Sequence, residues 1–185
     1  MRKAIMLTLI LTALSFGAGQ SKKLTPLPQE LQRDIIPGFS LLLPDNETRL
    51  KRDDLAKEAK KLGAKRVVFS FFASWCLKNC APEISLMRDN IAKLKEKGML
   101  VYLIDVREDL INEGDKVKEF VKAYADNKFP YYFDQKGNLL KDFGLVKNNE
   151  YNLPTIVVMD ADLRVLYVLE GEAGNDFPQI LWEDL

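Results

Sequence analysis

Two cysteines, Cys76 and Cys80, hold most of the chemistry that this sequence offers. They are the only cysteines in the chain and lie in the stretch FFASWCLKNCAPE, after a hydrophobic run and a tryptophan. A close cysteine pair can exchange disulfides, bind a soft metal such as Cu(I), or staple a loop. The spacing is Cys-x-x-x-Cys, one residue longer than the usual redox pair, so all three possibilities stay open at this point.

The rest of the composition removes several classes of site. The chain has no histidine, which excludes catalysis by histidine and metal binding through histidine. A four-ligand zinc site is therefore hard to assemble. The 27 basic residues balance the 27 acidic residues, so no basic excess indicates nucleic-acid binding. A dithiol remains the best candidate for chemistry, and we expect no metal and no cofactor beyond a Cys76–Cys80 disulfide.

The cysteines follow a strand and precede a helix. Residues 65–74 are apolar at nearly every position, which is typical of a strand buried on both faces. An apolar stripe at helical spacing then predicts a helix over 81–97. The unpaired N–H groups at a helix N-terminus favour a thiolate. Lys78 adds a positive charge nearby, and Trp75 is expected to shield one side of the site.

Pro82 decides the register of that helix. Proline is tolerated in a first turn but costs about 3 kcal/mol inside a helix. With Asn79 as the N-cap, Pro82 and Cys80 both fall in the first turn, and Cys76 lies in the preceding loop. Residues four apart on a helix lie about 6 Å apart at Cα, within the range that a disulfide tolerates. We therefore expect Cys76 to be the more exposed sulfur and the attacking thiol.

The other elements imply an α/β domain with a central, partly parallel sheet and helices on both faces. In such a sheet, chemistry gathers at the carboxyl ends of strands. Asp53 or Asp54 can cap the first predicted helix, with Leu55, Ala59 and Leu62 on its apolar face. The predicted elements are a hairpin over 39–50, helices over 53–63, 114–127, 137–145 and 175–185, and strands over 99–106, 130–134, 154–160 and 165–171.

The first residues predict export. Arg2 and Lys3 precede an apolar run over 4–16 and small residues at 17–19, as in a secretory signal peptide. The run is short for a spanning helix, which needs about 20 residues. We predict a signal peptide over 1–19, a linker or arm over 20–36 and one domain over 37–185. Export implies a periplasmic or otherwise extracytoplasmic location, with membrane attachment only if the segment is kept as an anchor.

Several motifs resemble the thioredoxin-like fold and, within it, the TlpA/ResA-type extracytoplasmic thiol–disulfide oxidoreductases. VVFSFFASWC is similar to their strand that runs into Trp-Cys, and PGFSLLLPDNETRLKRDDL to their N-terminal β-hairpin extension and first helix. YNLPTIVVMDADLRVLYVLEG resembles their proline loop and terminal hairpin. The resemblance spans about 37–171. It departs from the family in the Cys-x-x-x-Cys spacing and in Ser85, which stands where the family has a proline.

The resemblance implies a role for each matching residue. Cys76 would be the nucleophile and Cys80 the resolving thiol. Pro154 would follow a cis peptide bond beside the cysteines, and the backbone of Leu153 would pair with a substrate strand. Glu83 would relay protons for the resolving thiol, or else be an exposed first-turn carboxylate. The implied partners are disulfide-containing exported proteins and a membrane thiol reductant, with cytochrome maturation as one possible setting.

We therefore expect an exported oxidoreductase that reduces disulfides in partner proteins. One alternative is a Sco-like copper chaperone. The stretch CLKNCAPE resembles the cysteine spacing of such chaperones, but this chain lacks their histidine ligand. Another alternative is a non-catalytic thioredoxin-like binding module. A static staple is a third alternative, although so short a loop removes little unfolded-state entropy. Peroxidase action is disfavoured, because no threonine precedes Cys76 in a Thr-x-x-Cys arrangement.

Overall fold

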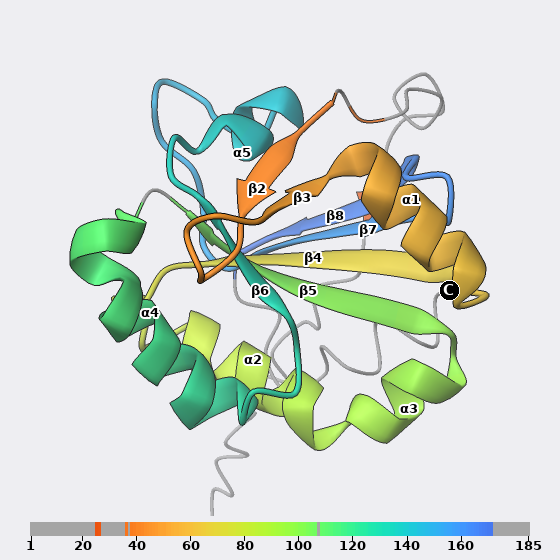
Figure 1. Ribbon diagram of the computed structural model, residues 1–185, viewed down its shortest axis with the longest axis horizontal. Coiled ribbons are helices and arrows are strands. Elements are labelled where there is room, and N and C mark those ends of the chain that lie inside the picture. The colour runs from red at the N-terminus through yellow and green to blue at the C-terminus, as the bar shows by residue number, and fades with distance from the viewer. Residues whose placement is uncertain (1–24, 27–35, 37, 107, 172–185) are drawn as a thin grey trace, which may run out of the picture.

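A twisted sheet runs through the centre of the protein (Figure 1). The structure is a computed structural model, and it describes residues 25–26, 36, 38–106 and 108–171. The strands of this part are β1 (Thr25–Pro26), β2 (Ser40–Leu42), β3 (Arg49–Lys51), β4 (Arg66–Phe72), β5 (Met99–Val106), β6 (Tyr131–Asp134), β7 (Thr155–Met159) and β8 (Val165–Glu170). They form one sheet in the order β1-β8-β7-β4-β5-β6-β2-β3.

The centre of the sheet is parallel and its flanks are antiparallel. β4, β5 and β6 are parallel neighbours, whereas β7 pairs antiparallel with β4, and β2 with β6. β2 and β3 form the predicted hairpin, and β7 and β8 form the second one. β1, inside the stretch predicted to be an arm, pairs with β8. The predicted mixed sheet is therefore confirmed, and it brings β4 to the middle.

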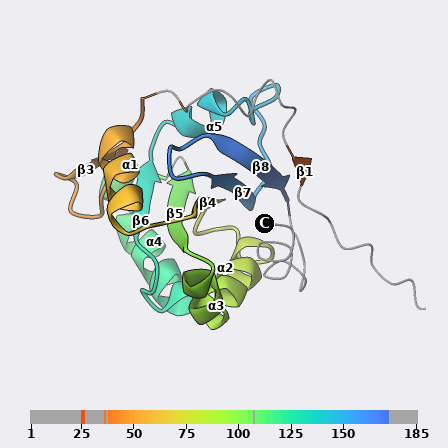
Figure 2. The ribbon, with the colours of Figure 1, turned by 90° about the vertical axis from the view of Figure 1, so that its right-hand side faces the viewer.

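Helices cover both faces of the sheet (Figure 2). The helices of the described part are α1 (Arg52–Lys61), α2 (Cys80–Asp89), α3 (Ile91–Glu96), α4 (Leu110–Ala125) and α5 (Asn138–Asp142). One buried cluster lies between the sheet and α2, α3 and α4, and a second lies between the sheet and α1 and α5. Alternate residues of β4 and β5 face the two clusters, which explains why both strands are apolar almost throughout.

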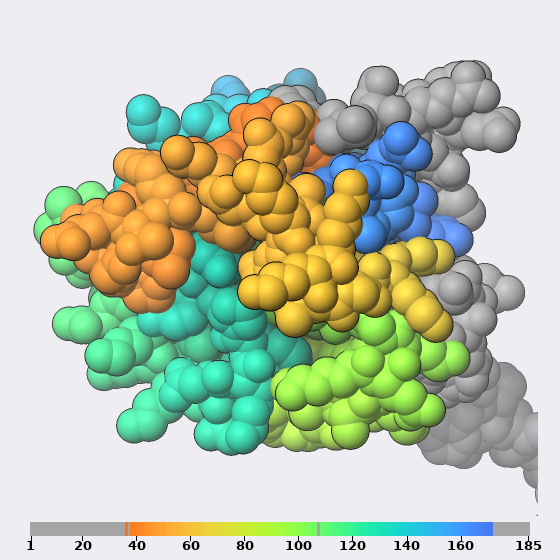
Figure 3. Space-filling view, turned by 45° about the vertical axis from the view of Figure 1, so that its right-hand side comes forward, coloured from red at the N-terminus to blue at the C-terminus, as the bar shows by residue number. Residues whose placement is uncertain are grey.

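The helix α1 also contacts the turn between β7 and β8 (Figure 3). Lys60 on α1 pairs with Asp162 in that turn at 2.6 Å. α1 begins at Arg52, so the expectation that Asp53 or Asp54 caps it is wrong; both lie in its first turn, where the helix dipole favours acidic residues. Leu62 was expected inward but is 59% exposed, because the helix ends at Lys61.

The helix predicted over 81–97 is two helices, α2 and α3. Asn90 separates them with a backbone that is not helical. Its side-chain amide donates to the carbonyl oxygen of Leu86 at 2.9 Å, and such local hydrogen bonds compete with helix continuation. The predicted apolar stripe still faces the core: Ile84, Met87 and Leu94 are buried.

The helix α4 begins four residues before the predicted start. Asp109 is its N-cap: one carboxylate oxygen accepts from the N–H of Ile111 at 2.8 Å, while Glu113 accepts from the N–H of Asp109 at 3.1 Å. Its inward face carries Val117, Phe120 and Val121, which are buried, and Tyr124, which is partly buried against the same cluster. The predicted closing helix over 175–185 and the signal segment over 1–19 lie outside the described residues.

Replacing Asp109 with alanine is expected to lower the free energy of unfolding by about 1 kcal/mol, because the first turn of α4 loses its cap. Urea unfolding followed by circular dichroism measures this. Asn79→Ala is the control: Asn79 occupies the N-cap position of α2, but its side chain makes no capping hydrogen bond. Equal losses in the two variants would contradict the account of the cap.

Candidate functional site: a disulfide at the end of the central strand

Cys76 and Cys80 are joined by a disulfide at the carboxyl end of β4. Their Cα atoms lie 5.3 Å apart. The N–H of Cys80 donates to the carbonyl oxygen of Cys76 at 3.0 Å, which closes a helix-like turn between the two residues. α2 begins at Cys80, with Asn79 as the N-cap residue and Pro82 in the first turn. The predicted register is thus confirmed, and the extra residue between the cysteines belongs to the loop.

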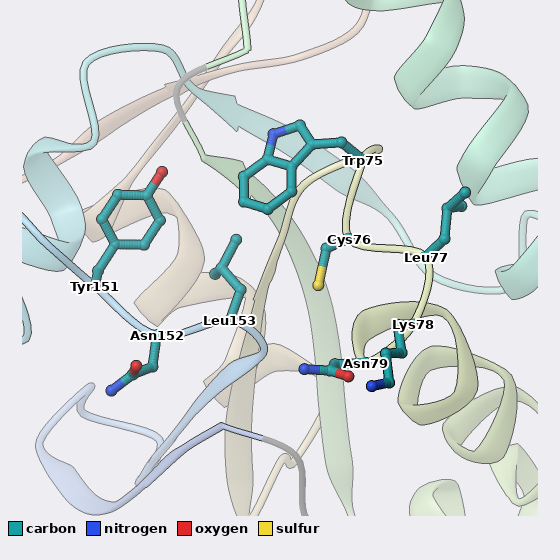
Figure 4. Close-up of a pocket in the computed structure, with 8 residues that line it drawn as sticks. All are labelled: Trp75, Cys76, Leu77, Lys78, Asn79, Tyr151, Asn152 and Leu153. Carbon is teal, nitrogen blue, oxygen red and sulfur yellow. The ribbon is translucent and has the colours of Figure 1, made fainter.

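The two cysteines differ in their access to solvent. Cys76 is 8% exposed, whereas Cys80 is 0% exposed and packs within the cluster beneath α2. Cys76 also borders a cavity of about 350 Å³ between residues 75–79 and residues 151–153. Figure 4 shows its sulfur between these two segments. A partner could therefore reach Cys76 from the cavity but not Cys80.

Apolar side chains form the rim beside Cys76. Trp75 borders the cavity yet is 65% exposed, so it stands at the edge of the site and does not cover it. Leu77 follows Cys76 and is 56% exposed. Large apolar side chains this exposed on both sides of a buried sulfur are typical of a surface that another molecule contacts.

Leu153 and Pro154 form the opposite side of the cavity, before β7. The Leu153–Pro154 peptide bond is cis, as the resemblance implied. Leu153 borders the cavity, and neither its backbone N–H nor its carbonyl makes a hydrogen bond within the described residues. Tyr151 lies across the cavity from Trp75 (Figure 4). The open backbone of Leu153 thus faces the same space as Cys76.

Glu83 is buried in α2, three residues after Cys80. It is only 4% exposed, so the alternative of an exposed first-turn carboxylate is wrong. Residues three apart on a helix share a face, which places Glu83 on the side of Cys80. A proton-relay role for Glu83 stays a prediction.

Three polar residues of the site were not predicted from the sequence: Ser74, Asp105 and Glu108. The backbone N–H of Ser74 donates to Oε2 of Glu108 at 2.6 Å, and its hydroxyl donates to Oε1. Asp105 is 0% exposed near the carboxyl end of β5, and Glu108 is 4% exposed. Only Asp105 left a signal in the sequence. It is an acidic residue inside the otherwise apolar run MLVYLIDV, and acidic residues are rarely buried in such a run unless they are paired.

Asp105 is held in its protonated form. Burial of the carboxyl group, together with the nearby negative charge of Glu108, raises the pKa of Asp105 from 3.8 to about 10. Between these values the unfolded chain releases this proton and the folded chain keeps it. The contribution of Asp105 to the free energy of unfolding therefore decreases as pH rises through this range.

Asp105→Asn should remove this pH dependence. We expect wild type and variant to have similar stability near pH 4, and the variant to be the more stable at pH 8. The slopes of the free energy of unfolding against pH should differ by at most about 1.4 kcal/mol per pH unit, the value for one proton. Urea unfolding at several pH values measures both slopes. Asp162→Asn, at an exposed ion pair, serves as the control and should leave the slope above pH 5 unchanged. Parallel curves for wild type and Asp105→Asn would contradict the assignment.

No group of three or more histidine, cysteine, aspartate or glutamate side chains is placed to hold a metal ion in the part of the chain that the structure describes. The same part contains no helix with the length and apolarity needed to span a bilayer.

The fold and the placement of the cysteine pair define a thioredoxin-like protein. A solved thiol:disulfide interchange protein of the thioredoxin family from Chlorobium tepidum TLS has a similar fold, with a TM-score of 0.57, 26% identity and coverage of 80% of this chain and 92% of that one. StoA from Bacillus subtilis shares the fold with a TM-score of 0.55, at 16% identity over 80% of this chain and 98% of that one.

Residues 33–168 match the AhpC/TSA family, and the chain belongs to that family. It is also similar to the thiol-disulfide oxidoreductase ResA of Bacillus thuringiensis subsp. konkukian, with 36% identity over 119 residues. That match covers 64% of this chain and 62% of the ResA chain, so the chain matches about three fifths of its relative's length.

Proposed function

We propose that this protein is an exported thiol–disulfide oxidoreductase that reduces disulfides in partner proteins. The observation that carries the proposal is the asymmetry of the cysteine pair. One sulfur borders an open cavity at the end of the central strand, and the other is fully buried behind it at the start of a helix. This is the arrangement that a nucleophile and a resolving thiol require. The similarity to ResA supports the same activity.

The reaction runs in two exchange steps. The Cys76 thiolate attacks one sulfur of a partner disulfide, and the other partner sulfur leaves as a thiolate and takes a proton from solvent. A mixed disulfide then joins Cys76 to the partner. Cys80, once deprotonated, attacks Cys76, closes the intramolecular disulfide and releases the second partner thiolate. Two electrons have then passed from the dithiol to the partner.

Glu83 is the residue that we assign to the second step. Cys80 must lose a proton before it attacks, and it is buried away from water. Glu83 is buried on the same side of the first turn of α2 and is suited to accept that proton. In this proposal, Cys76, Cys80 and Glu83 perform the chemistry.

The partner binds along the cavity wall. The backbone of Leu153 offers an open N–H and an open carbonyl to an extended partner segment, which is how an added strand gains affinity without sequence preference. Trp75 and Leu77 would contact apolar side chains that flank the partner cysteine. Pro154, which has no N–H of its own, ends that open segment before β7.

The place of action is outside the cytoplasm. The basic start, the apolar run and the small residues over 1–19 support export, and an oxidising compartment supplies partner disulfides. Each turnover leaves Cys76 and Cys80 oxidised, so the proposal requires a thiol reductant at the membrane to reopen the pair. The proposal includes cytochrome maturation as the process in which this protein reduces partner disulfides.

The test is an insulin-reduction assay with dithiothreitol as electron donor. The protein should accelerate insulin precipitation well above the rate with dithiothreitol alone. Titration of the reduced protein with Cu(I) separates the copper-chaperone alternative. Tight one-to-one binding of Cu(I) together with no acceleration of insulin reduction would overturn the proposal.

A further inference from the structure

The cavity beside Cys76 has walls of different polarity. In Figure 4, the indole of Trp75 lies above the Cys76 sulfur, whereas the side chains of Lys78 and Asn79 lie below it. All of them border the cavity, and the open backbone of Leu153 faces it from the other side. A chain segment that passes the sulfur therefore meets an apolar ring at one end and an ammonium group and an amide at the other.

Lys78 is the one charged residue among the described residues that line this cavity. It is exposed, and no carboxylate of the described part forms an ion pair with it. Two acidic residues lie near the opposite wall: Glu150 precedes Tyr151, and Glu170 accepts a hydrogen bond from Asn152 at 3.2 Å. Neither of the two borders the cavity. The positive charge of Lys78 is therefore available to a bound anion.

Asn79 occupies the N-cap position of α2 but does not cap it. The side chain of an N-cap asparagine usually accepts a hydrogen bond from the first turn, yet this one makes no hydrogen bond within the described residues. It is half-buried and turned toward the space beneath the Cys76 sulfur (Figure 4). A half-buried amide with its donors and its acceptor open can bind a polar group of a ligand.

The long spacing of the cysteines brings these side chains to the cavity. Three residues stand between Cys76 and Cys80, and α2 begins only at Cys80. All three therefore stay in the loop, and all three border the cavity. A Cys-x-x-Cys loop would present one side chain fewer at this place. The additional residue thus enlarges the surface that a partner can contact.

The two walls fit an extended segment that pairs with Leu153. In such a segment, side chains at alternate positions share a face, so the residues two before and two after the partner cysteine point the same way as its sulfur. With that sulfur at Cys76, one of these two side chains extends toward Trp75 and the other toward Lys78 and Asn79. An apolar side chain suits the first place, and a carboxylate suits the second.

We propose that Lys78 and Asn79 select partner segments in which an acidic residue stands two positions from the reactive cysteine. Lys78 pairs with the carboxylate, Asn79 donates a hydrogen bond to it, and Trp75 contacts an apolar residue on the other side. Lys78 and Asn79 determine specificity and take no part in the exchange itself. The inference deepens the proposed function and rests on it in one respect, namely that Cys76 attacks a disulfide in a peptide segment.

The test measures the first exchange step with synthetic peptides and the reduced full chain. Each peptide has a central cysteine joined by a disulfide to 2-thiopyridine. Leucine stands two positions to one side of it, and glutamate, glutamine or lysine two positions to the other, and both orders are made. The Cys76 thiolate attacks the peptide sulfur, the peptide–pyridyl S–S bond breaks, and pyridine-2-thione leaves. The absorbance of the thione gives the rate.

In at least one order, the glutamate peptide should react about three- to tenfold faster than the lysine peptide at low salt, with the glutamine peptide between them. Added sodium chloride should reduce this ratio, because salt screens exposed charges. Each ratio compares two peptides on the same protein, so a change in the intrinsic reactivity of Cys76 cancels. Equal rates for the three peptides in both orders would overturn the proposal.

Three variants assign the preference to the cavity wall. Lys78→Glu should reverse it, and Asn79→Ala should lower the glutamate-to-lysine ratio about twofold without reversing it. Lys57→Glu is the matched control: Lys57 is exposed on α1, which packs on the other face of the sheet, and the substitution changes the net charge equally. It should leave the ratio unchanged within about twofold. Equal changes in Lys78→Glu and Lys57→Glu would overturn the proposal.

Two features keep the test decisive. If Lys78→Glu does not fold, the peptide and salt series on the wild-type chain decides alone. Failure of the inference also differs from failure of the proposed function. Rapid but equal reaction with every peptide would overturn the inference only, whereas reaction with every peptide no faster than that of free glutathione would overturn the proposed function.

Discussion

Cys76→Ser is expected to reduce the acceleration of insulin reduction by at least about a hundredfold, to the rate of dithiothreitol alone. A serine hydroxyl is not ionised at neutral pH and does not attack a disulfide. Cys80 cannot replace it, because it is 0% exposed and does not border the cavity. The measurement is the initial rate of turbidity at several protein concentrations.

Stability is the control for this result. Both Cys76→Ser and Cys80→Ser remove the disulfide, which closes a short loop and contributes about 2 kcal/mol through the unfolded state. The two variants should therefore have similar midpoints in urea unfolding while failing at different steps. If Cys76→Ser kept wild-type turnover, the buried sulfur or another group would be the nucleophile, and the assignment would be wrong.

Cys80→Ser is expected to stop the reaction at the mixed disulfide. Cys76 can still attack a partner, but no second thiol is present to release it. The lifetime of the adduct should increase at least about a hundredfold relative to wild type. With oxidised glutathione as the probe, intact mass spectrometry should find one glutathione per chain in Cys80→Ser and very little in wild type, because Cys80 clears the adduct.

The matched variant for this trapping experiment is the double variant Cys76→Ser/Cys80→Ser. It should form no adduct, since these two are the only cysteines of the chain. Glutathione that accumulated on Cys76 in wild type as much as in Cys80→Ser would remove the resolving role from Cys80. Cys76 and Cys80 would then act as two independent thiols, and the staple and copper alternatives would be favoured over disulfide exchange.

The sequence was sufficient to predict the features that local rules determine. A nearly continuous apolar run predicted the buried central strand, and β4 is buried at six of its seven positions. The tolerance of proline in a first helical turn placed Cys80 inside α2 and Cys76 before it. Resemblance to a family, and no local rule, predicted the cis bond before Pro154.

The parts that sequence reasoning missed depend on contacts between distant residues or on side-chain competition with the backbone. Ser74 and Glu108 are 34 residues apart and meet only because β4 and β5 are parallel neighbours with adjacent carboxyl ends. The break at Asn90 comes from a side-chain hydrogen bond that the apolar stripe does not reveal. The exposure of Leu62 follows from a helix end one residue earlier than the spacing suggested.

A redox titration distinguishes an exchanging Cys76–Cys80 pair from a structural disulfide. The wild-type protein is equilibrated with buffers of graded thiol and disulfide content, and free thiols are counted after acid quenching. We expect Cys76 and Cys80 to open together in one reversible two-electron transition, with a midpoint above about −300 mV, the limit typical of structural disulfides. A pair that stays closed in buffers poised far below this potential would be a structural staple and would contradict a role in disulfide exchange.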